Sequence, residues 1–412
     1  MRYPGWLVLK RSWSLPQNYR FGKCIYHFCD MKIRVLETIR QGLIGGGETH
    51  LLSLVENLDK SLFEPIVLSF TEGPMVERLK EMGVETHVIH SERPFDISVW
   101  GKVKKFIRSH DIEIVHAHGT RAASNVLNAA RSLRLPILYT VHGWSFHDDQ
   151  HPIVKSLRKK GEEYLTGRMD LNISVSGSNQ QTGKNAFKGF ESVVIANGID
   201  QEKFNPDRTF KDVRKEIGIP EDATVVLFIA RFTHHKQPLK VIKGFCEAAK
   251  AEPSLRLLMV GEGDARPEAL ELVKKLDIGD KVYFQDFRQD VPDVLAAADI
   301  FVLASLWEGL AISLLEAMSM GKAVVGSNVD GNSEVIRHME NGWLAGINEL
   351  EKNLAQAFIA LSRDHSLRKR FQQNAVETIT SRYNAVTMTR RTEELYHKVL
   401  RERKVLAKRS EY

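Results

Sequence analysis

The sequence has few cysteines and no long apolar run. Its 412 residues include three cysteines, Cys24, Cys29 and Cys246, which give neither a disulfide framework nor metal-ligand spacing. No apolar run approaches the ~20 residues that a membrane-spanning helix needs. Low-complexity tracts and short repeats are also missing. These absences argue against a disulfide-stapled or membrane-spanning protein, and we expect a protein of the reducing cytoplasm.

The excess of positive charge lies at the two ends of the chain. The formal net charge is +6; residues 1–30 contribute +4 and the last fourteen residues contribute +3, so the segment between them sums to −1. A nucleic-acid-binding protein carries its basic residues in a patch on the folded body. The distribution of charge therefore argues against a nucleic-acid partner.

Residues 1–30 have neither helical nor strand periodicity, whereas the residues after Met31 read as a first strand. We therefore predict a poorly ordered extension over residues 1–30. Two interpretations of it stay open. The extension is either upstream sequence ahead of a natural start at Met31, or an arm of the protein that is disordered or touches a membrane.

From residue 32 onward, short β-branched runs alternate with helix-length segments, which is typical of βαβ units around parallel sheets. The strands expected in the first half are Ile33–Glu37, Glu64–Ser69, Glu85–Ile89, Ile112–His116, Ile137–His142, Leu171–Val175 and Ser192–Ile195. Those expected in the second half are Val225–Ala230, Leu255–Val260, Val282–Gln285, Ile300–Ala304, Ala323–Gly326 and Gly342–Leu344. Three helices are expected to follow, at Leu350–Leu361, Ser366–Ser381 and about Ala385 to Arg403.

Turn-forming residues interrupt the alternation near its middle. Asn197-Gly198 and Asn205-Pro206-Asp207 predict a linker between two domains, and the chain is longer than one ordinary domain. We predict an α/β fold of two doubly wound domains, at residues 31–203 and 204–385. A terminal helix over 386–412 is expected to pack back on the first domain and end in a basic tail. Because ligands bind at the carboxyl ends of strands in such sheets, we expect the site in the cleft between the domains.

Three consecutive glycines, Gly45, Gly46 and Gly47, lie between the first strand and a helix expected at Thr49–Leu58. Glycines there let the backbone approach a phosphate or a sugar, and a helix N-terminus favours anions. The G-x-G-x-x-G spacing of dinucleotide-binding proteins is absent, which argues against a dehydrogenase. A tight strand-to-helix turn is the alternative explanation.

Two basic residues, Arg231 and Lys236, follow the first strand of the second half. A guanidinium fork and a lysine point charge at the carboxyl end of a strand suit a diphosphate. The alternative is a pair of solvated surface cations.

Two glutamates, Glu308 and Glu316, lie before and within a helix expected at Ile312–Met320. A carboxylate accepts two hydroxyl donors at once, which suits the vicinal diols of a ribose or a hexose. The unpaired N–H groups at the start of this helix can hold phosphate or sugar oxygens, and they belong to Gly309, Leu310 and Ala311. The alternative is chance spacing of two unrelated acids.

Histidines are expected at the ends of two strands: His116 and His118 after the fourth, and His142 after the fifth. A histidine at the carboxyl end of a strand is placed to contact a substrate, although a histidine bonded to the backbone is the alternative. Asp148 and Asp149 are adjacent rather than spaced as metal ligands, and we expect no metal site.

Together these motifs resemble those of the retaining GT-B glycosyltransferases of family 4, also called group 1, from Met31 to about residue 400. The most specific part is Glu308-x7-Glu316 with its flanking segments, Ala298–Leu303 and Gly331–Glu334. The other matches are Arg231 with Lys236, Asn197–Asp200 and Gly45–Glu48. The chain departs from the family pattern at Ala230, Gln237, Asp286 and Ala323, which leaves the donor base open between uridine and guanosine.

The resemblance implies transfer of a hexose-type sugar from a nucleotide-diphosphate sugar to a hydroxyl of a glycan or lipid-linked acceptor. It implies retention of configuration, with no cofactor and no divalent metal. Arg231 and Lys236 would neutralise the diphosphate, Glu308 would hold the donor sugar, and His142 would lie beside the reacting sugar. Glu316 would hold the ribose, and the remaining substrate contacts would come from Gly45, Gly46, Gly47, Gly309, Leu310 and Ala311.

Two other functions fit the same fold: a nucleotide-sugar epimerase, and an inactive sugar-nucleotide-binding partner of a second transferase. Retention of the whole residue set argues against the inactive partner. A basic cluster also suggests that the protein binds peripherally to the inner face of a membrane. The cluster comprises Lys155, Arg158, Lys159 and Lys160. Because Glu162 and Glu163 follow directly, a solvated helix face is the alternative.

Overall fold

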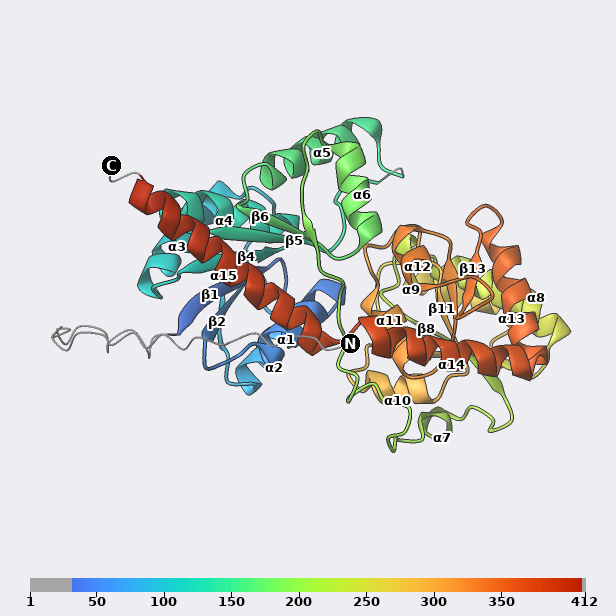
Figure 1. Ribbon diagram of the computed structural model, residues 1–412. Helices are drawn as coiled ribbons and strands as arrows, with labels where there is room; N and C mark the ends of the chain where they lie inside the picture. The colour runs from blue at the N-terminus through green and yellow to red at the C-terminus, as the bar shows by residue number, and fades with distance from the viewer. Residues whose placement is uncertain (1–31, 148, 410–412) are drawn as a thin grey trace, which may run out of the picture.

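The structure is a computed structural model that describes residues 32–147 and 149–409, with side chains described up to residue 403. Predictions for residues 1–30 therefore lie outside the described residues. The chain forms two lobes, each built on one parallel sheet (Figure 1). The first sheet has the order β3-β2-β1-β4-β5-β6-β7, with β1 Ile33–Ile39, β2 Phe63–Ser69, β3 Glu85–Val88, β4 Ile114–His118, β5 Ile137–Val141, β6 Leu171–Ser174 and β7 Val193–Val194.

The second sheet repeats this winding in six strands with the order β10-β9-β8-β11-β12-β13. In both sheets the chain winds outward from a central strand in one direction and then in the other. The direction reverses between β1 and β4 in the first sheet and between β8 and β11 in the second. Such switch points leave crevices at the carboxyl ends of the strands. The strands are β8 Thr224–Ile229, β9 Leu255–Val260, β10 Val282–Gln285, β11 Ile300–Leu303, β12 Ala323–Ser327 and β13 Trp343–Ala345.

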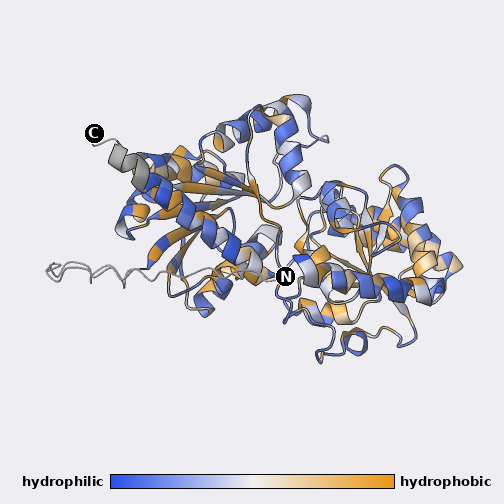
Figure 2. Ribbon diagram, in the orientation of Figure 1, coloured by the Kyte–Doolittle hydropathy of each residue, from blue (hydrophilic) through white to orange (hydrophobic). Residues whose placement is uncertain are grey.

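Helices cover both faces of each sheet, because alternate side chains of each buried strand point to opposite faces. In β1, Leu36 packs with α3 and α4, whereas Val35 and Ile39 pack with α1 and α2 on the other face. Figure 2 shows apolar strands at the centre of each lobe and polar outer helix faces. The first-half helices are α1 Gly46–Asn57, α2 Pro74–Glu81, α3 Ile97–Ser109, α4 Thr120–Ser132, α5 Pro152–Thr166 and α6 Gly177–Ala186.

The second half carries a short 3-10 helix, η1 His234–Lys236, and the larger part of the helices. Its sheet is sandwiched between α8 and α13 on one face and α11 and α14 on the other. These helices are α7 Val213–Ile217, α8 Pro238–Ala251, α9 Arg266–Lys275, α10 Val291–Ala296, α11 Ile312–Ser319, α12 Asp330–Val335, α13 Leu350–Arg363 and α14 His365–Arg382.

The last helix, α15 Ala385–Arg409, lies against the first lobe although it follows the second in sequence (Figure 1, red). Met388, Tyr396 and Val399 are buried in one apolar cluster with Val35 and other first-lobe residues. Where the chain crosses between lobes, the Ile199 N–H donates to the Tyr383 carbonyl at 3.0 Å. The first lobe is therefore completed by the end of the chain.

Several expected boundaries are wrong by one to three residues for identifiable reasons. Helix α1 begins at Gly46 rather than Thr49, because the glycines form its first turn and the Thr49 N–H donates to the Gly45 carbonyl at 2.8 Å. Strand β4 begins at Ile114 rather than Ile112, because the Ile112 N–H instead donates to the Ile107 carbonyl in the turn after α3. Strand β5 ends at Val141, so His142 lies in the loop after it.

Within the part of the chain that the structure describes, none of the helices is both long enough and apolar enough to cross a bilayer.

Candidate active site in the cleft between the two sheets

A cleft of about 920 Å³ lies between the two lobes. Residues that follow β1, β4 and β5 line it from the first lobe, and residues that follow β8 and β11 line it from the second. The strand ends at both topological switch points thus face one cavity. Its volume falls in the range of about 300–1,000 Å³ that is typical of small-molecule sites.

The cleft contains about half of the site residues expected from the sequence. Six of them line it, namely Gly46, Gly47, His142, Arg231, Glu308 and Gly309. Five do not line it in this conformation, namely Gly45, Lys236, Leu310, Ala311 and Glu316. Lys236 still reaches the site indirectly, because its Nζ lies 2.5 Å from Glu308 Oε1.

Glu316 is the predicted residue that lies farthest from expectation. It is a buried residue of α11, and burial raises its pKa to about 7, with Lys203 as a weak opposing charge. No ion pair or side-chain hydrogen bond of Glu316 is found among the described residues. A carboxyl group in this state does not stabilise the fold, since burying it without a partner is costly.

Two arginines from opposite lobes line the cleft. Arg40 directly follows β1, and Arg231 lies two residues beyond β8. Burial lowers the pKa of Arg231, and the nearby Arg40 lowers it further, whereas Glu48 and Glu308 raise it. The buried Glu48 offsets part of this charge, with its Oε1 3.6 Å from Arg40 Nε. Two close guanidinium groups are stabilised when an anion lies between them. Sequence reasoning missed Arg40, which could have been identified as a site residue from its position directly after a strand.

Glu308 keeps its charge although it is buried. Burial alone would raise its pKa, but Lys236 and then His235 outweigh burial, so that the pKa of Glu308 is lowered. Glu308 therefore presents an ionised carboxylate next to Arg231, within reach of hydroxyl donors in the cavity.

A stack of three aromatic rings also lines the cleft. Trp307 stacks on His147, with ring centroids 4.0 Å apart and planes 16° apart, and on His235 at 4.3 Å and 15°. His147 belongs to the first lobe, so the stack joins the two lobes. No spacing in the sequence pointed to it.

The loop before α11 docks directly on the first lobe. A Cβ at Gly309 would lie 2.1 Å from the His142 carbonyl oxygen, so that only glycine allows this approach. Ser176 Oγ donates to the Gly309 carbonyl at 2.7 Å, and Asn197 Nδ2 donates to the Leu310 carbonyl at 2.8 Å. Glycine here therefore serves contact between the lobes.

Glu334, part of the motif after the paired glutamates, bridges the lobes as well. Its carboxylate accepts from the N–H groups of Gly177 and Ser178 at 3.0 and 2.9 Å, at the start of α6. A negative charge at a helix N-terminus is favourable.

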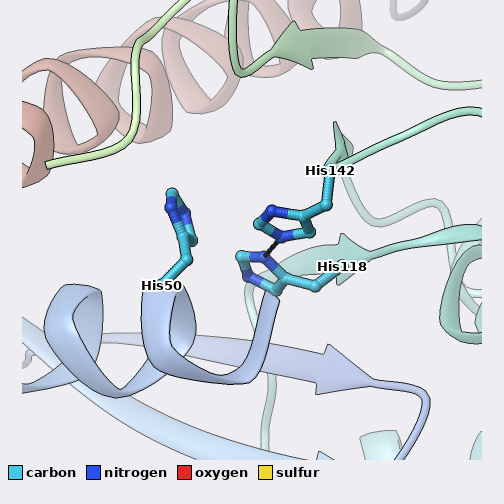
Figure 3. A group of neighbouring side chains, drawn as sticks. All are labelled: His50, His118 and His142. Atoms are coloured by element: carbon cyan, nitrogen blue, oxygen red, sulfur yellow. Dashed lines mark hydrogen bonds between the residues drawn. The ribbon is translucent and has the colours of Figure 1, made fainter. Parts of the chain in front are cut away.

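Three histidines converge on the first-lobe side of the cleft (Figure 3). His118 Nδ1 lies 3.1 Å from His142 Nε2, and His50 Nδ1 lies 2.9 Å from Asn197 Oδ1. Burial lowers the pKa of each ring: to about 3 for His50, to about 4 for His118, and well below the usual value for His142. All three rings are therefore neutral near pH 7. His116 does not line the cleft; it is buried against Tyr396 and Thr140.

Two family profiles match almost the whole described chain. The profile described as Glycosyltransferase Family 4 matches residues 44–203, and that described as Glycosyl transferases group 1 matches residues 209–378. The chain belongs to the group 1 glycosyltransferases. The family predicted from the motifs is thus confirmed, and the two profiles divide this glycosyltransferase between its two lobes.

Curated relatives of this glycosyltransferase match along most of their length. It is 26% identical over 328 residues to N-acetyl-alpha-D-glucosaminyl L-malate synthase of Bacillus anthracis, covering 79% of this chain and 84% of the relative. It is 25% identical over 380 residues to UDP-Gal:alpha-D-GlcNAc-diphosphoundecaprenol alpha-1,3-galactosyltransferase of Escherichia coli, covering 89% and 97%.

Solved structures share the arrangement of both lobes. HepE of Anabaena in complex with UDP and glucose superposes with a TM-score of 0.79 at 22% identity, covering 89% of this chain and 100% of HepE. WaaG, a glycosyltransferase involved in lipopolysaccharide biosynthesis, superposes with a TM-score of 0.69 at 15% identity, covering 88% and 99%. The predicted GT-B fold is confirmed.

Proposed function

We propose that this glycosyltransferase moves a hexose-type sugar from a UDP-linked donor to a hydroxyl of a glycan or lipid-linked acceptor, with retention of anomeric configuration. The observation that carries the proposal is that Arg40 and Arg231 line one cleft from opposite lobes, together with the ionised Glu308. This arrangement suits a diphosphate joined to a polyol. The UDP-glucose complex of HepE and the UDP-galactose donor named for the E. coli relative favour uridine over guanosine.

In the proposed reaction, the bond between the anomeric carbon and the diphosphate oxygen breaks, and negative charge develops on the departing diphosphate. The acceptor hydroxyl oxygen forms a bond to the anomeric carbon, and its proton passes to the departing diphosphate. Arg231 and Arg40 stabilise this charge, with Lys236 close by through its pairing with Glu308. The unpaired N–H groups at the start of α11 add to the positive potential. Glu308 accepts hydrogen bonds from hydroxyls of the donor sugar, and His142 lies next to that sugar.

Glu316 remains the proposed acceptor for the ribose hydroxyls. Its buried and raised-pKa carboxyl group lacks the partner that a diol would supply. A shift of α11 and the loop before it, when the donor binds, would bring Glu316 to the ligand.

We also propose that α5 rests on an anionic membrane surface, where a lipid-linked acceptor would be presented. Ile153 and Leu157 are each 65% exposed on α5, and Leu157 and Arg158 also line the cleft. The basic residues Lys155, Arg158, Lys159 and Lys160 belong to the same helix. Apolar side chains next to basic ones are typical of interfacial helices.

The donor is tested by calorimetry with UDP-glucose, UDP-galactose, UDP-N-acetylglucosamine and GDP-mannose, in buffer with EDTA. We expect heat with at least one UDP-sugar and none with GDP-mannose. Anomeric proton couplings of the transferred sugar, measured by NMR, then report retention. Binding of GDP-mannose alone, loss of binding in EDTA, or an inverted product each contradicts one part of the proposal. Isomerised donor in the absence of acceptor would favour the epimerase.

The membrane contact is tested by co-sedimentation with phosphatidylglycerol vesicles. Ile153→Ser should weaken binding, whereas Ile347→Ser, at a residue 50% exposed on the second lobe, should not. Equal binding of both variants would remove α5 as the contact.

A further inference from the structure

We propose that Glu37 and His118 act as positioning residues that hold His142 in a single tautomer, with its Nδ1 lone pair directed to a hydroxyl of the donor sugar. The inference rests on the proposed function for the identity of that hydroxyl, whereas the tautomer follows from hydrogen bonds within the protein.

Glu37 is the first residue of a hydrogen-bond chain that runs through His118 to His142. The register of β1 against β4 pairs Glu37 with His116 and Ile39 with His118, so that the Glu37 side chain lies between both histidines. Its Oε2 lies 2.9 Å from His118 Nε2 and 3.1 Å from His116 Nδ1, and its Oε1 accepts from the Tyr396 hydroxyl at 2.6 Å. Burial alone would raise the pKa of Glu37, but the two histidines outweigh it and lower the pKa strongly. Glu37 is thus an ionised carboxylate that can only accept.

The acceptor role of Glu37 fixes which nitrogen of His118 donates and which accepts. Because Glu37 only accepts, the Nε2 of His118 must carry the proton and donate it in the 2.9 Å hydrogen bond. Since His118 is neutral, its Nδ1 is then bare and accepts. The partner of that atom is His142 Nε2 at 3.1 Å, which must therefore be the donor (Figure 3).

His142 is left with one bare nitrogen, Nδ1. This atom is buried and has no hydrogen-bond partner among the described residues. The ring is held in place by His50, at a centroid distance of 4.8 Å, and by Gly47, where a Cβ would lie 3.4 Å from the ring. Because His142 lines the cleft, an O–H donor of a bound sugar is the group that would satisfy Nδ1.

The same hydrogen-bond chain also connects the cleft to α15, near the end of the sequence. Tyr396 belongs to α15, and its hydroxyl bonds both Glu37 and His116 Nδ1, the latter at 2.7 Å. The orientation of a residue at the cleft thus depends on a helix that follows the second lobe in sequence.

The first test is direct. In ¹⁵N-labelled protein, the nitrogen shifts of His142 should report a protonated Nε2 and a bare Nδ1 near pH 7. A protonated Nδ1 would overturn the proposal, whatever the enzyme's activity. Zinc content after purification is measured in parallel, because His50, His118 and His142 place one ligand nitrogen each within 4.8 Å of one another. Stoichiometric zinc on these nitrogens would overturn the proposal as well, since His118 Nδ1 would bind the ion instead.

The second test is Glu37→Gln, which keeps the size of the side chain but supplies an N–H donor. If that donor faces His118 Nε2, the polarity of the whole chain inverts and His142 Nδ1 becomes protonated. We expect the nitrogen shifts to exchange and kcat/KM to fall ~10–100-fold, because the sugar hydroxyl meets a donor instead of an acceptor. The Kd for UDP should stay unchanged. Unchanged kcat/KM together with exchanged shifts would overturn the role of Nδ1.

Donor sugars that each lack one hydroxyl test whether a sugar hydroxyl contacts His142 Nδ1. One deoxy sugar should lose ~10-fold or more in kcat/KM with the wild-type enzyme and lose little with Glu37→Gln, since both changes remove the same hydrogen bond. Additive losses for every deoxy sugar would overturn the contact. Glu64→Gln, at a half-exposed glutamate of β2 that pairs with Arg34 and does not line the cleft, is the matched control and should change kcat/KM less than ~3-fold. If no UDP-sugar binds, the proposed function fails, whereas the wild-type nitrogen shifts still decide the tautomer.

Discussion

The two walls of the cleft are built from different chemistry. The second-lobe wall carries formal charges, with Arg231, Lys236 and Glu308 grouped around one ion pair. Besides Arg40 and other charged residues, the first-lobe wall carries neutral imidazoles, with His118 and His142 hydrogen-bonded to each other. The difference indicates that the charged residues stabilise charge, whereas the histidines of the first-lobe wall orient hydrogen bonds.

The supply of counter-charges explains the difference. Glu308 is buried, yet it keeps its charge because Lys236, with its Nζ 2.5 Å from Glu308 Oε1, lowers the pKa of Glu308. On the opposite wall, Glu37 is an anion that receives donors from two histidines and a tyrosine. Burial there favours neutral imidazoles over additional cations. The same degree of burial therefore produces an ionic wall or a neutral wall, depending on the partner.

The comparison is tested most strongly by Arg231→Ala. Loss of one preorganised charge at the developing diphosphate charge should lower kcat/KM ~100–1,000-fold, or ~3–4 kcal/mol, with unchanged thermal unfolding. Arg231 is a cleaner target than Lys236, because removal of Lys236 leaves the buried Glu308 unpaired and destabilises the fold. Lys243→Ala, at a half-exposed lysine of α8 that pairs with Glu351 of α13, is the control. An Arg231 variant with wild-type turnover would show that the charged wall does not act on the diphosphate.

Contact between the walls is tested by Gly309→Ala. The added methyl group would lie 2.1 Å from the His142 carbonyl oxygen, so that the two walls must separate. A misplacement of about 1 Å at a reacting centre costs up to ~100-fold in rate, and we expect a loss of that order in kcat. Gly279→Ala, where a Cβ meets nothing within 4 Å, is the control. Equal turnover in both variants would mean that the cleft works without this close approach.

The charged wall could be predicted from the sequence because its residues are close together in the chain. Arg231 and Lys236 share one loop, and Glu308 and Gly309 share another, so that spacing alone is informative. The GT-B fold was equally accessible, since parallel strands alternate regularly with helices. The histidine wall could be predicted only in part. His118 and His142 were noted as strand-end residues, but their partners were not.

The missing partners depend on tertiary structure. Glu37 meets His118 only because β1 pairs with β4 in one register, and it meets Tyr396 only because α15 returns to the first lobe. A register shifted by one residue would turn Glu37 to the opposite face of the sheet. Arg40 is similar, because its importance comes from Arg231 on the other lobe. No local pattern records such contacts.

The neutral wall predicts a loss of stability in acid. The pKa values of His50 and His118 in the folded protein, about 3 and about 4, lie below the value of about 6.5 expected in the unfolded chain. The unfolded state therefore binds protons first as the pH falls below 6.5, and the free energy of unfolding decreases. Glu316 offsets part of this effect, because its raised pKa favours the folded state as the pH falls from 7.

We expect a net loss of about 2 kcal/mol between pH 7 and pH 5, measured by urea unfolding. His50→Gln should flatten the profile, because glutamine does not titrate. A wild-type profile that is already flat would contradict the neutral state of these rings.

The smallest expected effect concerns Glu316. This residue follows Glu308 of the charged wall closely in sequence, but it is buried as the histidines of the first-lobe wall are. Its pKa in the folded protein is about 7, above the usual value of 4.5, so its contribution to stability is complete below about pH 4.5 and is lost as the pH rises through 7. Glu316→Gln does not titrate and should therefore gain about 1 kcal/mol in unfolding free energy, relative to the wild type, between pH 6 and pH 8. Donor binding should reduce this gain, because ribose hydroxyls would supply the partner that the ionised carboxylate lacks. A gain that is the same with and without UDP would separate Glu316 from the nucleotide and leave it a buried acid of α11.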